Sequence, residues 1–295
     1  MTMRVEGLSD AARSEVMALA DRAAAADGVF PLNEQAVISL AEAGRHRLAW
    51  REGRLVGYLC VYDGAAQLVV DPLWRRQRVG SRLLVDHDIC IWDQKEPDPV
   101  VPEVWAFGDL GCGQGFCAAH GYRAVRSLLV MESSVRPARR GDPPAGVRIG
   151  AYHSGDLAEL VGLNARAFHD HPEQGRWVAA DFAARMAQPW FDPAGLLIAR
   201  TDEGLMVGFH WTKAEHGDGE VYVIGVDPGW SGRGLGRALL DAGLAHLAAR
   251  RVGRTRLWVD GENLAATSLY EKSGFSVVRR DVRYRRRSDV RDHQS

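Results

Sequence analysis

The sequence lacks any long hydrophobic run. No segment of its 295 residues reaches the roughly 20 consecutive apolar residues that a membrane-spanning helix needs. Residues 1–10 contain acidic side chains and no extended apolar stretch, so the sequence predicts no secretory signal peptide there. We therefore expect a cytoplasmic protein without a membrane partner.

The sequence also has almost no net charge, because its 37 basic residues nearly balance 38 acidic ones. A surplus of positive charge produces the long-range field that attracts nucleic acids, and this chain has no such surplus. Residues 283–287 form a short basic run interrupted by Tyr284, which is typical of a solvated chain end. We expect a monomer with no nucleic-acid partner.

Cysteine is scarce, and all four cysteines lie in the first half of the chain: Cys60, Cys90, Cys112 and Cys117. In a cytosolic protein, buried free thiols are favoured over disulfides. Cys112 and Cys117 with His120 match no common zinc-ligand spacing, and a fourth ligand is not evident. We therefore expect no metal site.

What the chain does contain is an internal repeat. Residues 70–74 (VDPLW) match residues 226–230 (VDPGW), and residues 80–84 (GSRLL) match residues 236–240 (GRALL). Two more pairs of segments match in the same order, residues 48–58 with 198–209 and residues 119–125 with 272–278. An offset that stays near 150 residues indicates two copies of one fold.

The two copies are joined by a segment rich in proline, glycine and charge, residues 136–146, which is typical of an exposed linker. We therefore predict an amino-terminal domain over residues 1–140 and a carboxy-terminal domain over residues 147–295. Within each copy the pattern predicts the same series of elements: an amphipathic helix (10–26 or 156–168), a hairpin turning at Glu52-Gly53 or Glu203-Gly204, an apolar strand (67–70 or 221–226), a helix (80–91 or 236–250), a strand (clearest at 255–259), a short helix and a final strand. Such a mixture favours an α/β fold with one central sheet per copy.

In residues 221–240 an apolar strand ends at an Asp-Pro dipeptide, and a glycine-rich loop then starts a helix. Unpaired N–H groups at a helix N-terminus bind anions, and glycines let phosphates approach the backbone. One interpretation is a loop that only turns the chain. Another is a Rossmann dinucleotide site with Asp260 as the ribose-binding acid, although Gly232, Gly234 and Gly236 do not give the G-x-G-x-x-G spacing.

A third interpretation is that the segment resembles the acetyl-CoA motif of the GCN5-related N-acetyltransferases (GNAT), usually Gln/Arg-x-x-Gly-x-Gly/Ala. Gly234 and Gly236 match this motif, whereas Ser231 at its first position departs from it. Residues 262–275 resemble the closing segment of the same family, in which an Asn lies near the CoA arm and a Tyr near the thioester sulfur. The resemblance implies two tandem GNAT domains, each with a mixed, mostly antiparallel central sheet flanked by helices.

Residues 167–177, 190–196, 208–213 and 219–223 resemble the mycothiol synthase (mycothiol acetyltransferase) family. That family transfers acetyl from acetyl-CoA to the cysteinyl amine of cysteinyl-glucosaminyl-inositol, the last step of mycothiol formation. The resemblance implies acceptor contacts from Glu34, Glu173, Lys213 and Glu220, with Trp258 where some relatives have Tyr. It implies acetyl-CoA contacts from Ile224, Gly225, Val226, Ser231, Gly232, Arg233, Gly234, Leu235, Gly236, Arg237, Asn263, Leu264, Ala265, Ala266, Thr267 and Ser268, and the matching strand end of the first copy contributes Leu68, Val69 and Val70.

Acetylation of an amine needs a neutral amine and a proton for the departing thiolate. We expect Glu220 to act as the base, directly or through a water, and Tyr270 to protonate the CoA sulfur. The first copy has Arg78, Gly64 and Cys117 opposite Gly234, Glu220 and Tyr270, so we expect it to be catalytically silent. The alternatives are a tandem acetyltransferase for an aminoglycoside or a peptide N-terminus, and a non-catalytic CoA-binding sensor.

Overall fold

The structure is a computed structural model that describes residues 2–5, 7–41, 45–62, 64–85, 102–134, 141–169 and 174–287. The chain forms two compact units. Unit 1 contains Met1–Leu128 and Arg279–Ser295, and unit 2 contains Leu129–Val278. The compact units therefore differ from the division at residue 140 that the linker suggested, because the last part of the chain belongs with unit 1.

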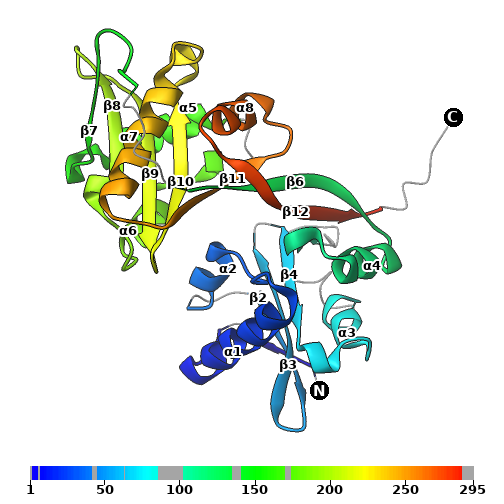
Figure 1. The fold of residues 1–295 in the computed structure, drawn as a ribbon. Coiled ribbons are helices and arrows are strands. Elements are labelled where there is room, and N and C mark those ends of the chain that lie inside the picture. The colour runs from blue at the N-terminus through cyan, green and yellow to red at the C-terminus, as the bar shows by residue number, and fades with distance from the viewer. Residues whose placement is uncertain are drawn as a thin grey trace, which may run out of the picture. The chain divides into compact units, whose positions relative to one another are not determined.

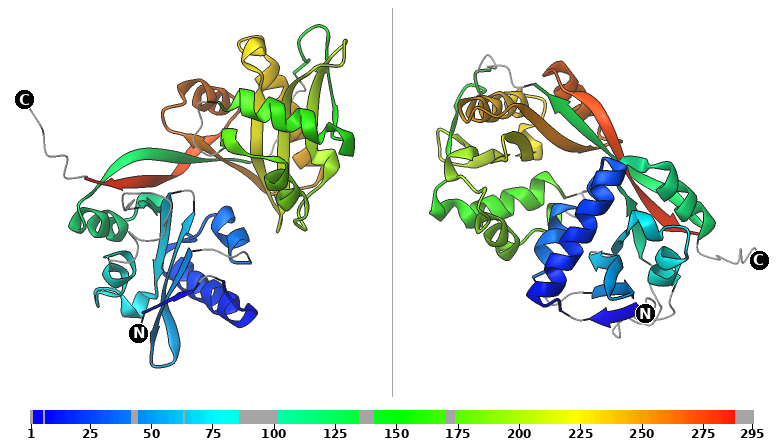
Figure 2. Two further views of the ribbon diagram at one scale, coloured as in Figure 1. Left: turned by 180° about the vertical axis from the view of Figure 1, so that it is seen from behind. Right: turned by 60° about the horizontal axis from the view of Figure 1, so that its bottom comes forward.

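Unit 1 is a sheet between two layers of helices. Its strands are β1 (Thr2–Val5), β2 (Arg45–Arg51), β3 (Arg54–Tyr62), β4 (Ala65–Val70) and β5 (Glu103–Ala106), and its helices are α1 (Asp10–Asp27), α2 (Glu34–Ser39), α3 (Val79–Val85) and α4 (Gly111–Ala119). The strands lie in the order β1-β2-β3-β4-β5, and β12 (Ser276–Arg286) follows β5. Helices α1 and α2 pack on one face, and α3 and α4 pack on the other (Figure 2).

Unit 2 repeats this plan. Its strands are β7 (Val147–Ala151), β8 (Leu196–Thr201), β9 (Met206–Glu215), β10 (Asp218–Val226) and β11 (Arg254–Asp260), and its helices are α5 (Leu157–Ala167), α6 (Ala179–Met186), α7 (Leu235–Ala249) and α8 (Leu264–Lys272). The order is β6-β11-β10-β9-β8-β7, with β6 spanning Tyr122–Ser133. Helix α7 crosses one face of the sheet in Figure 1, and α5 and α6 pack on the other. This mixed, mostly antiparallel arrangement confirms the predicted fold class.

Two strands pass from one unit to the other. Strand β6 ends the first copy in sequence, and its residues from Leu129 onward belong to unit 2. Strand β12 ends the second copy, and its residues from Arg279 onward belong to unit 1, where Val282 and Tyr284 pair with Ala106 and Val104 of β5. Each sheet is thus completed by residues from the other sequence copy.

The repeat is visible in the local structure after β4 and β10. Asp71 and Asp227 each accept a hydrogen bond at Oδ1 from the backbone two residues later, at 3.1 and 3.0 Å, and so begin the 3₁₀ turns Pro72–Trp74 and Pro228–Trp230. An arginine from the first helix of each copy, α1 or α5, binds each carboxylate, with Arg22 at 2.8 Å from Asp71 and Arg166 at 2.9 Å from Asp227. Short polar side chains favour such turns because they satisfy free N–H groups.

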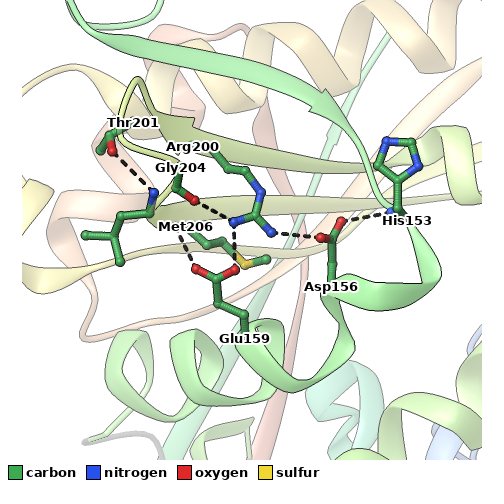
Figure 3. Close-up of polar contacts among 8 residues, drawn as sticks. His153, Asp156, Glu159, Arg200, Thr201, Gly204 and Met206 are labelled. Atoms are coloured by element: carbon green, nitrogen blue, oxygen red, sulfur yellow. Dashed lines mark hydrogen bonds and ion pairs between the residues drawn. The ribbon is translucent and has the colours of Figure 1, made fainter.

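Arg200 fixes α5 against the β8–β9 hairpin (Figure 3). Its guanidinium donates to Glu159 at 2.6 Å, to Asp156 at 2.8 Å and to the carbonyl of Gly204 at 2.8 Å. The other oxygen of Glu159 accepts from the backbone N–H of Met206 at 2.9 Å. Burial alone would raise the pKa of Glu159, but the Arg200 hydrogen bond and that backbone donor lower it overall. The network joins the start of α5 to the β8–β9 hairpin.

Several sequence predictions need correction or fall outside the described residues. Cys60 and Cys117 are buried free thiols as expected, whereas Cys112 is exposed because it lies in the first turn of α4. Cys90 lies outside the described residues. Among the described helices, none has the length and hydrophobicity to span a membrane, and no cluster of potential metal ligands occurs in the same residues.

Candidate active site

A β-bulge interrupts β10 in its middle. The antiparallel register with β9 pairs Val221 with Thr212 and Val223 with Trp211, so Tyr222 is an extra residue. Tyr222 and Val223 consequently both contact the cluster beneath α5 and α6, although side chains of consecutive strand residues ordinarily point to opposite faces. The bulge changes the direction of β10 directly after Glu220.

The parallel pairing of β10 with β11 ends at the same place. It joins Asp218 to Arg254, Gly219 to Thr255 and Glu220 to Arg256, and the register between the two strands stops there in the described residues. From Val223 to Val226, β10 pairs with β9 alone among the described strands. An unpaired strand edge presents N–H and C=O groups to a ligand, so the predicted residues Ile224, Gly225 and Val226 lie where a CoA arm can hydrogen-bond to the backbone.

Gly225 is required here for packing. A β-carbon at this position would lie 2.7 Å from Cε1 of Phe209 and 3.0 Å from Cε2 of Phe168. Both rings belong to the cluster beneath α5, which holds this end of β10 against the helix layer. The glycine therefore lets the open strand edge lie close to two aromatic rings.

Glu220 lies between two cationic residues across the sheet. Its neighbour on β9 is Lys213, and its neighbour on β11 is Arg256. Lys213 also approaches Glu215 at 3.3 Å and lies over the ring of Trp190, with Nζ 4.8 Å from the centroid. Arg256 donates from Nε to Glu132 at 3.0 Å. Glu220 therefore has a cationic residue as its neighbour on each adjacent strand, and each of these cations also has a carboxylate partner of its own.

The glycine-rich loop follows β10 and begins α7. Gly232 and Gly234 have φ of 74° and 83°, in the left-handed region that favours glycine. Gly234 is the N-cap of α7, and because glycine has no side chain, the N-cap residue leaves the first N–H groups of the helix uncapped. Residues Ser231, Gly232, Arg233 and Gly234 are exposed. These features fit the predicted pyrophosphate site.

The two arginines of this loop have internal partners. The guanidinium of Arg233 lies over the ring of Trp230, 4.8 Å from the centroid. Arg237 donates from Nε to both oxygens of Asp241, each at 2.9 Å, and Asp241 is buried. The positive charge next to the loop is therefore held in place by the protein, and Asp241 partly neutralises that of Arg237.

Helix α8 borders the same region. The side chain of Asn263 accepts from the N–H of Ala266 at 3.0 Å and so caps the helix, while the first turn, including Leu264 and Ala265, is exposed. A β-carbon at Gly236 would lie 3.8 Å from Cγ2 of Val226 and 3.9 Å from Cδ2 of Leu269. The start of α7, the end of β10 and α8 are thus in contact, as the predicted acetyl-CoA site requires.

Tyr270 lies on α8 with its side chain in the core cluster that includes Val259 and Phe275. Burial raises its pKa above the ordinary value, which keeps the phenol protonated. Within the described part of the chain, its hydroxyl makes no hydrogen bond. The remaining predicted residues of α8, Thr267 and Ser268, lie one turn before Tyr270.

The predicted acceptor residues lie in different parts of the structure. Lys213 and Glu220 are neighbours across β9 and β10, and Trp258 on β11 is 42% exposed. Glu173 lies outside the described residues. Glu34 is the first residue of α2 in unit 1, so its contribution to acceptor binding stays a prediction.

Strand β4 of unit 1 differs from the corresponding strand β10 of unit 2. The pairing of β3 with β4 runs without a register shift from Gly57 and Val70 to Tyr62 and Ala65, so the described residues of β4 contain no bulge. The predicted CoA contacts Leu68, Val69 and Val70 thus pair with β3 without a shift. Because β4 pairs with β5 only from Ala65 to Gln67, their other edge is open among the described strands, like that of Ile224, Gly225 and Val226. The following loop nevertheless keeps the left-handed backbone, with φ of 62° at Arg76 and 63° at Arg78.

Sequence reasoning missed Tyr222, Arg185 and Arg256. Arg185 of α6 donates from Nε to the hydroxyl of Tyr222 at 2.9 Å. Arg256 is found only through the register with Glu220. The only signal in the sequence was a tyrosine within an otherwise aliphatic strand two residues after a glutamate, and that pattern does not predict a bulge.

Comparisons with known proteins identify the family and the fold. The Acetyltransferase (GNAT) family model matches residues 147–275, which include β10, the glycine loop and α8. The solved structure of a GCN5-related N-acetyltransferase from Sphaerobacter thermophilus has a TM-score of 0.74 at 22% identity, covering 96% of this chain and 94% of that one. A tandem GNAT protein from the clavulanic acid biosynthesis pathway has a TM-score of 0.71 at 19% identity, covering 96% and 97%. These two structures show the shared fold.

Relatives with higher identity show the family. A mycothiol acetyltransferase from Clavibacter michiganensis subsp. michiganensis is 43% identical over 294 residues, which cover 96% of this chain and 94% of the relative. A mycothiol acetyltransferase from Thermomonospora curvata is 43% identical over 292 residues, covering 95% of each. The chain therefore belongs to the mycothiol acetyltransferase family within the GNAT enzymes, and it is an acetyl-CoA-dependent N-acetyltransferase.

Proposed function

We propose that this enzyme acetylates the cysteinyl amine of cysteinyl-glucosaminyl-inositol in the last step of mycothiol formation, in the cytoplasm. The acceptor is inferred from the near full-length similarity to mycothiol acetyltransferases. The structural observation that best supports the proposal is Glu220, a carboxylate between Lys213 and Arg256 at the point where β10 and β11 stop pairing. A base is needed at this point because the amine must lose a proton.

Acetyl-CoA is proposed to bind along the open edge of β10 with its pyrophosphate at the start of α7. Backbone N–H groups of the loop from Ser231 to Arg237 would hold the phosphates at the start of α7, where the N-cap Gly234 has no side chain to occupy the site. Ile224, Gly225 and Val226 would bind the pantetheine arm and polarise the thioester carbonyl. The exposed start of α8, from Asn263 to Ser268, would border the arm.

In the proposed reaction, the amine nitrogen attacks the thioester carbonyl carbon, forming the new C–N bond. Glu220 accepts the amine proton, directly or through a water, and the C–S bond then breaks. Tyr270, which is protonated at neutral pH, gives its proton to the departing sulfur. Glu34, Glu173, Lys213 and Trp258 would bind the polar acceptor, and correct placement of both substrates supplies much of the rate enhancement.

The first copy is proposed to be catalytically silent. Its strand β4 has no bulge among its described residues, and the sequence has Gly64 and Cys117 where the second copy has Glu220 and Tyr270. It therefore lacks the base, the acid and the change in strand direction on which the proposed reaction depends.

An acceptor panel tests the proposal. Purified protein and acetyl-CoA are mixed with cysteinyl-glucosaminyl-inositol, its analogue without inositol, an aminoglycoside or a peptide with a free N-terminus, and released CoA is measured. We expect the highest kcat/KM for the complete cysteinyl acceptor. Faster turnover of the aminoglycoside or the peptide would contradict the proposed acceptor, and CoA binding without turnover of any amine would instead support a sensor.

A further inference from the structure

We infer that Arg185 is a positioning residue for acetyl transfer, because it holds the β10 bulge through Tyr222 and thereby places Glu220. The inference rests on the proposed role of Glu220 as the base. Arg185 lies near the end of α6, on the opposite side of Tyr222 from the backbone of β10. No acceptor or CoA contact is assigned to it.

Contacts with Tyr222, Asp181 and Trp177 hold the guanidinium of Arg185 in place. Its Nε donates to the Tyr222 hydroxyl at 2.9 Å, its Nη1 donates to the carbonyl of Asp181 at 3.0 Å, and its central carbon lies 3.8 Å from the ring centroid of Trp177. The residue is 6% exposed. A buried cation costs free energy and is retained where its hydrogen bonds specify one arrangement of the surrounding residues. In this structure the hydrogen bonds of Arg185 specify the position of Tyr222, the bulged residue of β10.

Tyr222 is held on its other sides by aromatic rings. Its ring centroid lies 4.9 Å from that of Trp190 and 5.4 Å from that of Trp211. Since Trp211 and Trp190 also pack against each other at 5.9 Å, the tyrosine has one well-defined position. The hydrogen bond from Arg185 then sets how far the bulged residue projects from the sheet.

This position matters for Glu220 because the two residues are two apart on one strand. Side chains at such positions point to the same face, and Tyr222 is the extra residue that redirects the strand. Trp190, which contacts Tyr222, also lies beneath the ammonium group of Lys213, the cross-strand neighbour of Glu220. The same cluster therefore supports the proposed base and the cation beside it.

The test compares the wild type with Tyr222→Phe, Arg185→Lys and the double variant. We expect kcat for the amine acceptor to fall about 10- to 100-fold in either single variant, because a small displacement of the base is costly. The double variant should be no slower than the slower single variant, since both changes remove one hydrogen bond. The Kd of acetyl-CoA and its KM should change less than twofold, and the acidic limb of the kcat/KM pH profile should shift.

Arg200→Lys is the matched control. Arg200 is also a partly buried arginine with several hydrogen bonds, but it binds α5 and the β8–β9 hairpin away from the bulge. We expect this variant to lower Tm while leaving kcat and the pH profile unchanged. If Tyr222→Phe and Arg185→Lys behave in the same way as Arg200→Lys, the positioning role is overturned.

Hydrogen exchange separates failure of this inference from failure of the proposed function. Without substrate, peptides that cover residues 219–226 should exchange faster in Tyr222→Phe and Arg185→Lys than in the wild type. If the wild type does not acetylate the cysteinyl acceptor, the proposed acceptor is wrong, and the variants are then compared with the amine that the panel identifies. Unchanged exchange in β10 overturns the positioning role whatever the acceptor.

Discussion

Arg78 and Gly234 occupy equivalent positions in the two sequence copies and share a left-handed backbone, with φ of 63° and 83°. The preceding pair, Arg76 and Gly232, agrees in the same way, at 62° and 74°. A residue with a β-carbon pays about 1–2 kcal/mol for this conformation. The turn is therefore imposed by its surroundings, including the carboxylates of Asp71 and Asp227 that begin the 3₁₀ turns. The glycines of the second copy avoid this strain and place no side chain at the proposed phosphate site.

Gly234→Ala should lower the free energy of unfolding by about 1 kcal/mol and raise the KM of acetyl-CoA, because a β-carbon would project from the left-handed backbone at the start of α7. Gly204→Ala is the control, since Gly204 has φ of 89° in the β8–β9 turn and, like Gly234, has no atom within 4 Å of an added β-carbon. Gly204→Ala should lower the free energy of unfolding by a similar amount and leave the KM of acetyl-CoA unchanged. Denaturant unfolding and initial rates measure both quantities. An unchanged KM in Gly234→Ala would contradict the assigned phosphate loop.

Glu220→Gln should lower kcat by about 100-fold or more, because an amide cannot accept the amine proton. The acidic limb of the kcat pH profile should flatten for the same reason, whereas the Kd of acetyl-CoA should stay unchanged. Glu203→Gln, in the exposed β8–β9 turn, serves as the control and should behave like the wild type. A full kcat in Glu220→Gln would exclude the carboxylate as base.

Tyr270→Phe should reduce kcat by about 10- to 100-fold with little loss of stability. The hydroxyl of Tyr270 makes no hydrogen bond within the described residues, so its removal leaves no internal group unpaired. Tyr284→Phe offers the opposite case, since the Tyr284 hydroxyl donates to Asp109 at 2.8 Å in unit 1. That variant should lose about 1 kcal/mol of stability and keep its kcat. If the two variants exchange these phenotypes, the assignment of Tyr270 as the acid is wrong.

The free energy of unfolding should rise with pH between about 4 and 6.5 because of His210. Burial, together with nearby His246, lowers the pKa of His210 from 6.5 to about 4, although a hydrogen bond with the carbonyl of Leu239 opposes this. In this range the unfolded chain binds a proton that the folded chain does not, so acid favours unfolding. The free energy of unfolding should therefore be lower by about 3 kcal/mol at pH 4 than at neutral pH because of this residue.

His210→Gln should remove this pH dependence while keeping a side-chain donor for Leu239. Urea unfolding at a series of pH values measures the slope of the stability curve. The free energies of unfolding of wild type and variant should diverge below pH 6.5, once the difference between them at neutral pH has been subtracted. Parallel curves would show that the buried imidazole does not cause the acid sensitivity.

The order of elements was predictable from sequence because it depends on local signals. The helix over residues 10–26, the turn at Glu52-Gly53 and the glycine loop agree with α1, the β2–β3 turn and the start of α7. The bulge at Tyr222 was not predictable, because it depends on how β10 aligns with β9. Nor was the pairing of Glu220 with Arg256, since a one-residue shift in register would place a different residue there. The exchange of β6 and β12 between units likewise depends on long-range pairing.

Gly175→Ala should raise the KM of the acceptor without changing that of acetyl-CoA. A β-carbon at Gly175 would lie 2.2 Å from the carbonyl oxygen of Phe168, which is a clash with backbone and cannot be relieved by a side-chain rotation. The adjacent Gln174 is bound to buried Asn164 by two hydrogen bonds, at 2.7 and 2.9 Å. The substitution must therefore displace the segment directly after Glu173, the proposed acceptor contact.

Gly150→Ala, where an added β-carbon meets nothing within 4 Å, should leave both KM values unchanged. Equal increases in both KM values for Gly175→Ala would indicate general loss of structure and contradict a specific role in acceptor binding.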